Sequence, residues 1–246
     1  MIQYIIIFLG LYFLINLIKI KKPIIISVDG NIGSGKSTFI KILKNKFKNN
    51  NNIIFLQEPV DTWINIKDNE DNNILNKFYE NKNRWSYTFQ NFAFITRTML
   101  LNKLINNNNV SIFSKRKVII SERSTETDKN VFAKMLYDDK SISQLEYKIY
   151  KYWYKHLYSH QIHNIIYIRT EPGKSYQRIL KRSRDEEVTI TESYIKSVHD
   201  YHDTWLCNHG NYNLCVLDGN QEFENNNENC DKLIKKVNTF LNNLEL

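Results

Sequence analysis

The chain has 246 residues, of which 42% are hydrophobic, and it carries a formal net charge of +8. This length and composition exclude a disordered chain and suit one large α/β domain with a buried core. The basic residues are scattered without a long Lys/Arg block, so the charge suits a phosphate-bearing small molecule and we expect no nucleic-acid partner. Three cysteines without a CxxC pair favour a reducing compartment over a disulfide framework.

The first 18 residues contain no charge, and Lys19, Lys21 and Lys22 follow them directly. Such a stretch is at the lower length limit of a membrane-spanning helix, and its positive flank would keep the rest of the chain cytoplasmic. Two interpretations stay open: residues 1–18 anchor the protein to a membrane, or they are an apolar extension or a misassigned start. We therefore divide the chain into an apolar segment, 1–22, and one domain, 23–246.

Short apolar runs alternate with helical patterns along the domain. The predicted strands are Ile24–Val28, Ile53–Leu56, Val118–Ile120, Ile165–Ile168 and Cys215–Leu217. The predicted helices are Thr38–Phe47, Arg84–Ile105, Lys129–Tyr137, Glu171–Lys181 and one that closes the chain. Asn-rich stretches at 49–52, 106–109 and 225–229 are interpreted as surface loops. This order predicts an α/β fold with a five-stranded parallel sheet flanked by helices.

A glycine-rich loop follows the first predicted strand and opens the first predicted helix. It matches the pattern GxxxxGK[ST], in which backbone N–H groups surround phosphate oxygens. Its lysine reaches the outer phosphates of a nucleoside triphosphate, and its Ser hydroxyl ligates Mg²⁺. The predicted phosphate-binding residues are Gly30, Asn31, Ile32, Gly33, Ser34, Gly35, Lys36, Ser37 and Thr38.

Acidic residues follow the next two strands. In an open α/β sheet, ligands lie beyond the carboxyl ends of the strands. Glu58 is thus placed to accept a proton from an acceptor hydroxyl, and Glu122 lies on the expected Mg²⁺ side. Arg123 can contact the transferred phosphoryl group or hold Glu58 in place. The alternatives are a helix cap or an ion-pair partner for Glu58, and a surface ion pair for Glu122 with Arg123.

Three arginines, Arg178, Arg182 and Arg184, follow the fourth strand. Arg178 and Arg182 are four residues apart and so share a helix face. Guanidinium groups here can close over the triphosphate and neutralise charge in the transition state. The alternative is a solvated face on which the arginines pair with the acidic residues at 185–187.

Together these motifs resemble the deoxynucleoside kinase family. The resemblance runs from about Lys22 to the C-terminus and rests on GNIGSGKST, QEPV followed by Trp63, RWSYTFQNFAFITR, SERS and RSRDEE. It implies an ATP-dependent and Mg²⁺-dependent enzyme that phosphorylates the 5′-hydroxyl of a deoxynucleoside and that forms a homodimer. The apolar N-terminal segment departs from the soluble members of the family.

The resemblance also implies residue roles. Glu58 would be the catalytic base with Arg123 and Lys36 beside it, and Glu122 would assist Mg²⁺. Tyr79 and Glu187 would hold the sugar 3′-hydroxyl, and Gln90 would pair with the base between Trp63 and Phe132. Glu222 and Phe223 would lie in the loop that covers the donor adenine.

The spacing of the long predicted helix agrees with such a pocket. Gln90, Ala93 and Arg97 share one face of this helix, and Asp128 precedes Phe132 by four residues on the next. An Arg97–Asp128 pair resembles the deoxycytidine and deoxyguanosine kinases, so we expect deoxycytidine, deoxyadenosine or deoxyguanosine to be preferred over thymidine. Phe89, with Trp85 and Phe92, is assigned to the core.

Two rival functions remain at this stage. A thymidylate-type kinase would bind an acceptor that already carries a phosphate, which the negative charge of Glu58 would repel. A nucleotide-dependent switch would need a water-positioning residue and a partner surface, and it has no use for a pocket lined by Gln90, Arg97 and Asp128.

Overall fold

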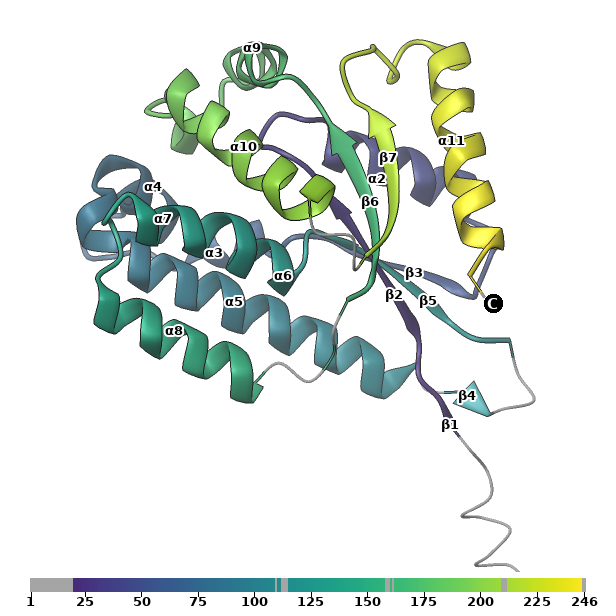
Figure 1. The fold of residues 1–246 in the computed structure, drawn as a ribbon, viewed down its shortest axis with the longest axis horizontal. Helices are drawn as coiled ribbons and strands as arrows, with labels where there is room; N and C mark the ends of the chain where they lie inside the picture. Colours follow the sequence, from purple (N-terminus) through teal and green to yellow (C-terminus); the bar gives the residue numbers. More distant parts are fainter. Residues whose placement is uncertain are drawn as a thin grey trace, which may run out of the picture.

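The computed structural model describes residues 20–108, 110–111, 115–157, 160, 162–208 and 212–244. Within these residues five parallel strands form one sheet in the order β3-β5-β2-β6-β7. The strands are β2 (Ile24–Asp29), β3 (Ile53–Leu56), β5 (Val118–Glu122), β6 (Asn164–Arg169) and β7 (Asn213–Asp218). Each predicted strand and the α/β class are confirmed, and helices cover both faces of the sheet (Figure 1).

The helices extend beyond the predicted set. They are α2 (Lys36–Lys46), α3 (Val60–Asn65), α4 (Ile74–Glu80), α5 (Lys82–Asn107), α6 (Thr125–Thr127), the π-helix η1 (Asp128–Ala133), α7 (Lys134–Asp138), α8 (Gln144–Leu157), α9 (Pro172–Arg182), the 3₁₀-helix η2 (Asp185–Glu187), α10 (Glu192–Asn208) and α11 (Asn227–Asn242). The sequence did not predict α3, α4, α8 or α10. The helix expected over Lys129–Tyr137 begins earlier and is a π-helix in its first half.

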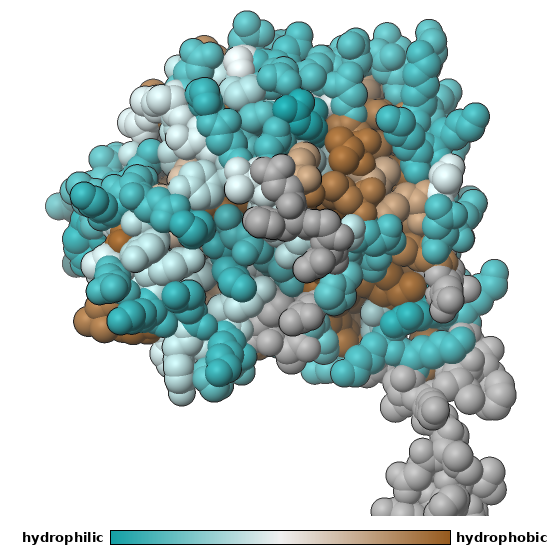
Figure 2. Space-filling model, viewed as in Figure 1, coloured by the Kyte–Doolittle hydropathy of each residue, from teal (hydrophilic) through white to brown (hydrophobic). Residues whose placement is uncertain are grey.

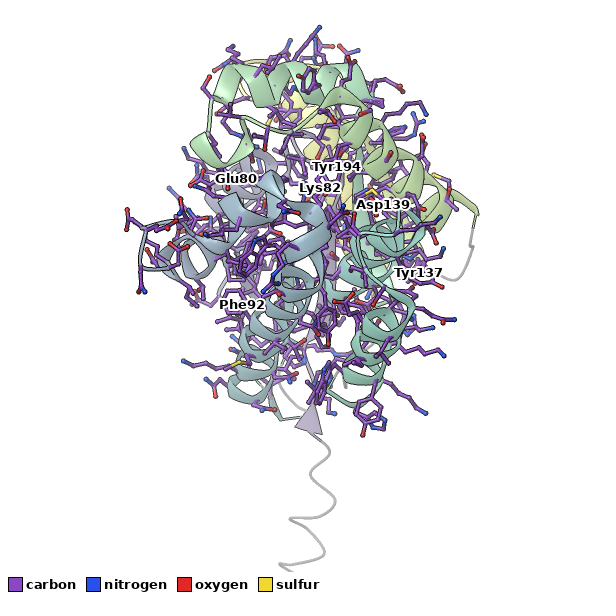
Figure 3. All side chains as sticks on the ribbon, turned by 90° about the vertical axis from the view of Figure 1, so that its left-hand side faces the viewer. Glu80, Lys82, Phe92, Tyr137, Asp139 and Tyr194 are labelled. Atoms are coloured by element: carbon purple, nitrogen blue, oxygen red, sulfur yellow. The ribbon has the colours of Figure 1, made fainter. Side chains whose placement is uncertain are left out.

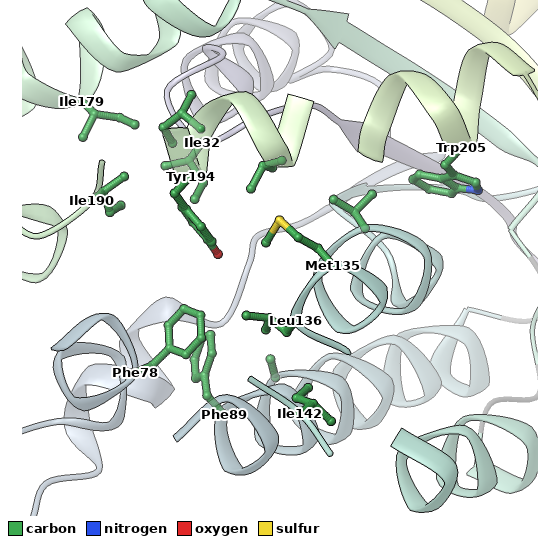
Figure 4. Packing of buried hydrophobic residues seen from close by; sticks show 14 of the residues in the cluster. Ile32, Phe78, Phe89, Met135, Leu136, Ile142, Ile179, Ile190, Tyr194 and Trp205 are labelled. Carbon is green, nitrogen blue, oxygen red and sulfur yellow. The ribbon is translucent and has the colours of Figure 1, made fainter. Parts of the chain in front are cut away.

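The sheet lies between two layers of apolar side chains. On one face Ile26 and Val28 of β2 pack with Phe39 of α2 and Val237 of α11, all completely buried. On the other face the side chains of β6 meet α5, α7 and α10, where Phe78, Phe89, Leu136 and Tyr194 gather (Figure 4). Each such apolar side chain contributes about 1.5–3 kcal/mol when fully buried.

Asparagines begin several helices and do not only form loops. The side chains of Asn73, Asn81 and Asn226 accept hydrogen bonds from backbone N–H groups in the first turns of α4, α5 and α11. The Asn-rich stretch at 106–109 enters the last turn of α5, and the stretch at 225–229 enters the first turn of α11. The prediction that both stretches are wholly loops is therefore wrong. At the start of α11 the Asn226 side chain satisfies a free N–H group, and at the end of α5 the Asn108 side chain donates to the carbonyl of Leu104.

The N-terminal strand β1 (Ile20–Lys21) pairs with β4 (Val110–Ser111) in a separate two-stranded sheet. The predicted membrane anchor, residues 1–18, lies outside the described residues. In the part of the chain that is described, no helix has the length and apolar character needed to span a bilayer.

Strand β7 forms one edge of the main sheet. Apolar side chains show on this face between β7 and α11 (Figure 2), where Leu214, Val216 and Phe240 line a groove of about 1020 Å³. This groove is distinct from the carboxyl edge of the sheet, where the predicted phosphate loop and the strand-end acids lie together.

Candidate active site

The glycine-rich loop joins β2 to α2, as its sequence predicts. Gly33 and Gly35 have φ values of 75° and 97°, a left-handed region that favours glycine, and a Cβ on Gly33 would lie 2.3 Å from the carbonyl oxygen of Ser175. The Asn31 side chain donates to the carbonyl of Ile195 at 2.8 Å and so ties the loop to α10. The structure thus gives Asn31 a role in holding the loop, and Ile32 packs into the core.

Lys36 and Ser37 lie at the start of α2 and turn toward this loop and β5. The Lys36 ammonium donates to the carbonyl oxygens of Gly30 and Asn31 at 3.0 and 2.6 Å. The Ser37 hydroxyl donates to Glu122 Oε1 at 2.6 Å. Burial, and then the positive charge of Arg123, lowers the pKa of Lys36 to about 7. The predicted pair of metal ligands, Ser37 and Glu122, is therefore in direct contact.

A buried network of charges lies beyond the ends of β3 and β5. Arg123 Nη1 donates to both Glu58 oxygens at 2.9 and 2.7 Å, and Arg97 Nη2 donates to Glu58 Oε1 at 3.0 Å. Arg97 also donates from Nε to Asp128 Oδ2 at 2.9 Å. Both arginines are less than one tenth exposed, so the network is largely shielded from water.

Glu58 is ionised throughout the neutral range because of its two partners. Burial alone would raise its pKa, but the guanidinium groups of Arg123 and Arg97 outweigh burial and hold the pKa at about 2. Arg123 has a φ of 59°, which is unusual for a residue other than glycine. Arg123 directly follows β5, and in this backbone conformation its side chain donates two bonds to Glu58. Non-glycine residues in such conformations cluster at active sites.

An aromatic cavity adjoins this network. The predicted acceptor residues all line it: Glu58, Trp63, Tyr79, Gln90, Ala93, Arg97, Arg123, Asp128, Phe132 and Glu187. Gln90 Oε1 is buried without a hydrogen-bond partner, so an acceptor atom is available to a ligand inside the cavity. The indole N–H of Trp63 is already taken by Thr96 Oγ1 at 3.0 Å.

The cavity also contains residues that the sequence did not assign to it. Phe89, predicted to be core only, lines the cavity and stacks on Phe78 with ring centroids 4.8 Å apart. Tyr194 comes from the unpredicted helix α10 and packs edge-on against Tyr79. The Lys82 ammonium lies 3.7 Å from the centre of the Tyr194 ring (Figure 3). The remaining unforeseen lining residues are Val60, Leu75 and Phe78 itself.

Asp29 is a further buried acid that sequence reasoning missed. It ends β2 directly before the glycine-rich loop and accepts hydrogen bonds from Ser27 and Thr127. Burial raises its pKa. Its position one residue before Gly30 was the available signal. Asp29 joins the loop to the segment that carries Asp128.

The predicted lid arginines have partners within the protein. Arg182 donates to both Glu187 oxygens at 2.6 and 2.5 Å, and Arg184 lies 3.8 Å from Glu187. Arg178 Nη1 donates to the carbonyl of Gly219 at 2.8 Å. The pairing with acidic residues that the sequence left open is thus present at Glu187. Arg182 and Arg184 still line the aromatic cavity.

A second cleft lies on the other side of the glycine-rich loop. It has a volume of about 370 Å³, and its lining includes Thr38, Arg178, Arg182, Glu222 and Phe223. Phe223 is buried against Phe39 and would be 2.8 Å from a Cβ on Gly35. Most of the predicted donor residues thus line one cleft, together with the unforeseen Lys181 and Glu224. Gly30, Asn31, Ile32, Ser34 and Arg184 do not line it, and Arg184 lines the aromatic cavity instead.

Comparison with known proteins agrees with this geometry. The family model described as deoxynucleoside kinase matches residues 26–242. The Fowlpox virus protein named "Probable deoxycytidine kinase FPV151" is 34% identical, covering 89% of this chain and 88% of its own. Deoxycytidine kinase 1 and the mitochondrial deoxyguanosine kinase of Xenopus laevis are 32% and 31% identical, with coverages of 93% and 93%, and of 88% and 89%, of the two chains. The chain belongs to the deoxynucleoside kinase family and is a kinase.

Proposed function

We propose that the chain transfers the γ-phosphoryl group of ATP, or of another nucleoside triphosphate, to the 5′-hydroxyl of a deoxynucleoside. The observation that carries this proposal is the position of Glu58. This carboxylate lies in the wall of the aromatic cavity, which Lys36 and Ser37 of the phosphate-binding loop also line. Acceptor hydroxyl and donor phosphate can therefore meet at one point.

Glu58 acts as the proton acceptor in this proposal. A hydroxyl that enters the cavity donates a hydrogen bond to the ionised carboxylate, while Arg123 and Arg97 hold the carboxylate in a fixed orientation. The proton moves late, because the hydroxyl becomes acidic only as its oxygen bonds to phosphorus. The low pKa of Glu58 therefore does not prevent its action as a base.

The donor side fits a triphosphate with Mg²⁺. Lys36, now bonded to loop carbonyls, can exchange them for phosphate oxygens. Ser37 and Glu122 offer a hydroxyl and a carboxylate oxygen to Mg²⁺, which prefers such ligands and neutralises charge on the phosphates when bound. Arg178, Arg182 and Arg184 supply further positive charge around the transferred group, with Glu222 and Phe223 on the adenine side of the cleft.

The part of the aromatic cavity that Tyr79, Gln90 and Arg97 line is the acceptor site. Tyr79 and Glu187 can hold the sugar 3′-hydroxyl, and burial together with the charge of Glu187 raises the pKa of Tyr79, which keeps its phenol proton. Gln90 can offer a donor and an acceptor to the base between Trp63 and Phe132. Ala93 leaves room for a purine beside the Arg97–Asp128 pair.

Deoxycytidine, deoxyadenosine and deoxyguanosine are the acceptors that this pocket favours over thymidine. The names of the relatives, deoxycytidine and deoxyguanosine kinases, support the same preference. The test is a panel of the four deoxynucleosides with ATP and Mg²⁺, with ATP turnover measured with and without acceptor. Turnover that does not depend on an added nucleoside would refute the proposal, and preference for thymidine monophosphate would favour the thymidylate-kinase alternative.

Nucleotide affinity should depend on pH through Lys36. Its pKa is about 7 in the free protein because of burial and of Arg123, and a bound triphosphate will raise this pKa. The contribution of the ammonium is then complete below about pH 7 and falls as the pH rises above that value, by up to about tenfold in affinity per pH unit. Titration with a non-hydrolysable ATP analogue between about pH 7 and pH 9 measures this. Lys36→Arg, whose charge does not titrate here, should remove the dependence; a flat wild-type profile would contradict it.

We further propose that two copies of the chain form a homodimer through an interface made by α5 and α8. These helices pack together and expose large apolar side chains, notably Met99 at 65% on α5 and Leu145 at 68%, Tyr152 and Trp153 on α8. Large exposed apolar side chains that gather on neighbouring helices mark protein interfaces. Sedimentation of the purified chain measures whether it forms a dimer.

A further inference from the structure

The edge of the sheet opposite the active site is basic. The described connections that meet there are residues 20–23, 47–52, 106–108, 110–111, 115–117, 160, 162–164, 208 and 212–213, and none of these residues is an aspartate or glutamate. We call the described cationic side chains of these connections the basic edge, which consists of Lys22, Lys48, Lys115, Arg116 and Lys117. The carboxyl edge, in contrast, balances its arginines with Glu58, Asp128 and Glu187.

Hydrogen bonds join these connections into one surface. Arg116 Nε donates to the carbonyl of Lys22 at 2.6 Å, and the Lys117 ammonium donates to the carbonyl of Asn51 at 2.6 Å. His160 lies close enough for Lys22 to lower its pKa, after the larger effect of burial. The basic residues are thus neighbours in space, although they come from separate parts of the chain.

The charges of the basic edge are not compensated within the described protein. Lys22, Lys48 and Lys115 are exposed, and in the described chain no carboxylate forms an ion pair with these three, with Arg116 or with Lys117. Arg116 and Lys117 use one N–H each for backbone carbonyls and keep their full charge. A surface with several unpaired cations attracts an extended anionic partner.

The N-terminal sequence indicates which partner this is. Strand β1 begins at Ile20 and lies at the same edge (Figure 1), and the uncharged stretch Met1–Ile18 precedes it in the sequence. Apolar residues next to a polybasic surface are the combination by which proteins bind anionic lipid bilayers, since one signal alone gives weak attachment. A nucleic acid would use the cations but has no use for the apolar stretch.

We propose that the basic edge docks on an anionic membrane surface, next to strand β1, which follows the apolar segment in the sequence. In this orientation the amino ends of the parallel strands face the membrane. The nucleotide cleft and the aromatic cavity, at the carboxyl edge, point away from the lipid and stay open to substrates. The inference does not depend on which nucleoside the enzyme uses.

The test measures partitioning of the full-length chain onto vesicles of phosphatidylcholine, with or without about one third phosphatidylserine. Phosphatidylserine should raise partitioning by at least about thirtyfold, since each base near the surface contributes about 1 kcal/mol. A several-fold increase in salt should remove this gain because exposed charges are screened. The double variant Lys22→Gln with Lys115→Gln should reduce the phosphatidylserine-dependent partitioning roughly thirtyfold, because each lysine near the membrane surface contributes a factor of about five.

Lys235→Gln with Lys236→Gln is the matched control, because it removes the same charge from exposed positions of α11 on another face. The control should bind vesicles like the wild type, and both double variants should keep normal kinase turnover, which reports correct folding. Partitioning that ignores phosphatidylserine, or that the control lowers equally, would overturn the proposal. Tighter binding to short duplex DNA than to the vesicles, lost in the Lys22/Lys115 variant, would replace the membrane with nucleic acid.

Discussion

Replacing Glu58 by Gln should lower turnover by roughly 10²- to 10⁴-fold, the usual contribution of a general base. The amide keeps the size of the carboxylate but cannot take up the proton of the acceptor hydroxyl. Nucleotide affinity should change little, because Lys36 and Ser37 hold their places through bonds to Gly30, Asn31 and Glu122. Steady-state kinetics with a deoxynucleoside acceptor, together with binding of an ATP analogue, separates the two effects.

The variant also changes the charge around Arg97 and Arg123, so folding needs its own measurement. Thermal unfolding of Glu58→Gln shows whether lost activity reflects lost structure. Asp218→Asn is a matched control, because Asp218 also ends a strand, β7, but is exposed and accepts a hydrogen bond from the backbone of Asn220. Turnover of a folded Glu58→Gln enzyme close to that of the control would remove Glu58 from the mechanism.

The parts of the site that could be predicted are those built by local pattern. A glycine-rich loop between a buried strand and a helix fixes its own geometry, and an acid directly after a parallel strand must lie at the carboxyl edge. This is why Lys36, Glu58 and Glu122 lie where the sequence places them. The order of strands and helices followed in the same way from short apolar runs.

The wall of the cavity depends on long-range packing and was predicted less well. Tyr194 enters from α10, a helix that sequence periodicity did not mark, and Phe78 enters from the short helix α4. Phe89 has the spacing of a core residue and is one, yet its ring also lines the cavity. Apolar spacing identifies a buried face but not whether a cavity borders it.

The ion-pair partners of the charged residues could also not be predicted in full without the fold. The spacing of Arg97 and Asp128 suggested a pair, and the structure contains it. It did not suggest that Arg97 would also bind Glu58, which comes from a different strand end. The π-helix η1 was equally invisible to sequence periodicity, although it carries Asp128 and such helices are frequent at functional sites.

Replacing Arg97 by Met together with Asp128 by Ala should raise thymidine use relative to deoxycytidine by roughly ten- to a hundredfold. The charged pair offers hydrogen bonds that an amino-bearing base can use, whereas the smaller uncharged side chains leave space for the thymine methyl group. Loss of a buried polar partner costs about 1–3 kcal/mol, which sets this range. A competition assay with both nucleosides measures the ratio directly, and a wild-type enzyme that prefers thymidine would contradict this account of the pocket.

The single variants distinguish the role of the pair in specificity from its role in folding. Arg97→Met alone removes the ion-pair partner of the buried Asp128 and one of the two guanidinium groups from Glu58, so it should destabilise the fold by about 3–5 kcal/mol. The double variant should recover most of this loss, because Glu58 keeps both bonds from Arg123 and no unpaired Asp128 remains. Denaturant unfolding of the wild type, of the single variants Arg97→Met and Asp128→Ala and of the double variant gives the coupling energy between the two positions. If the two losses simply add, Arg97 and Asp128 do not act as a pair, and the change in base preference would need another cause.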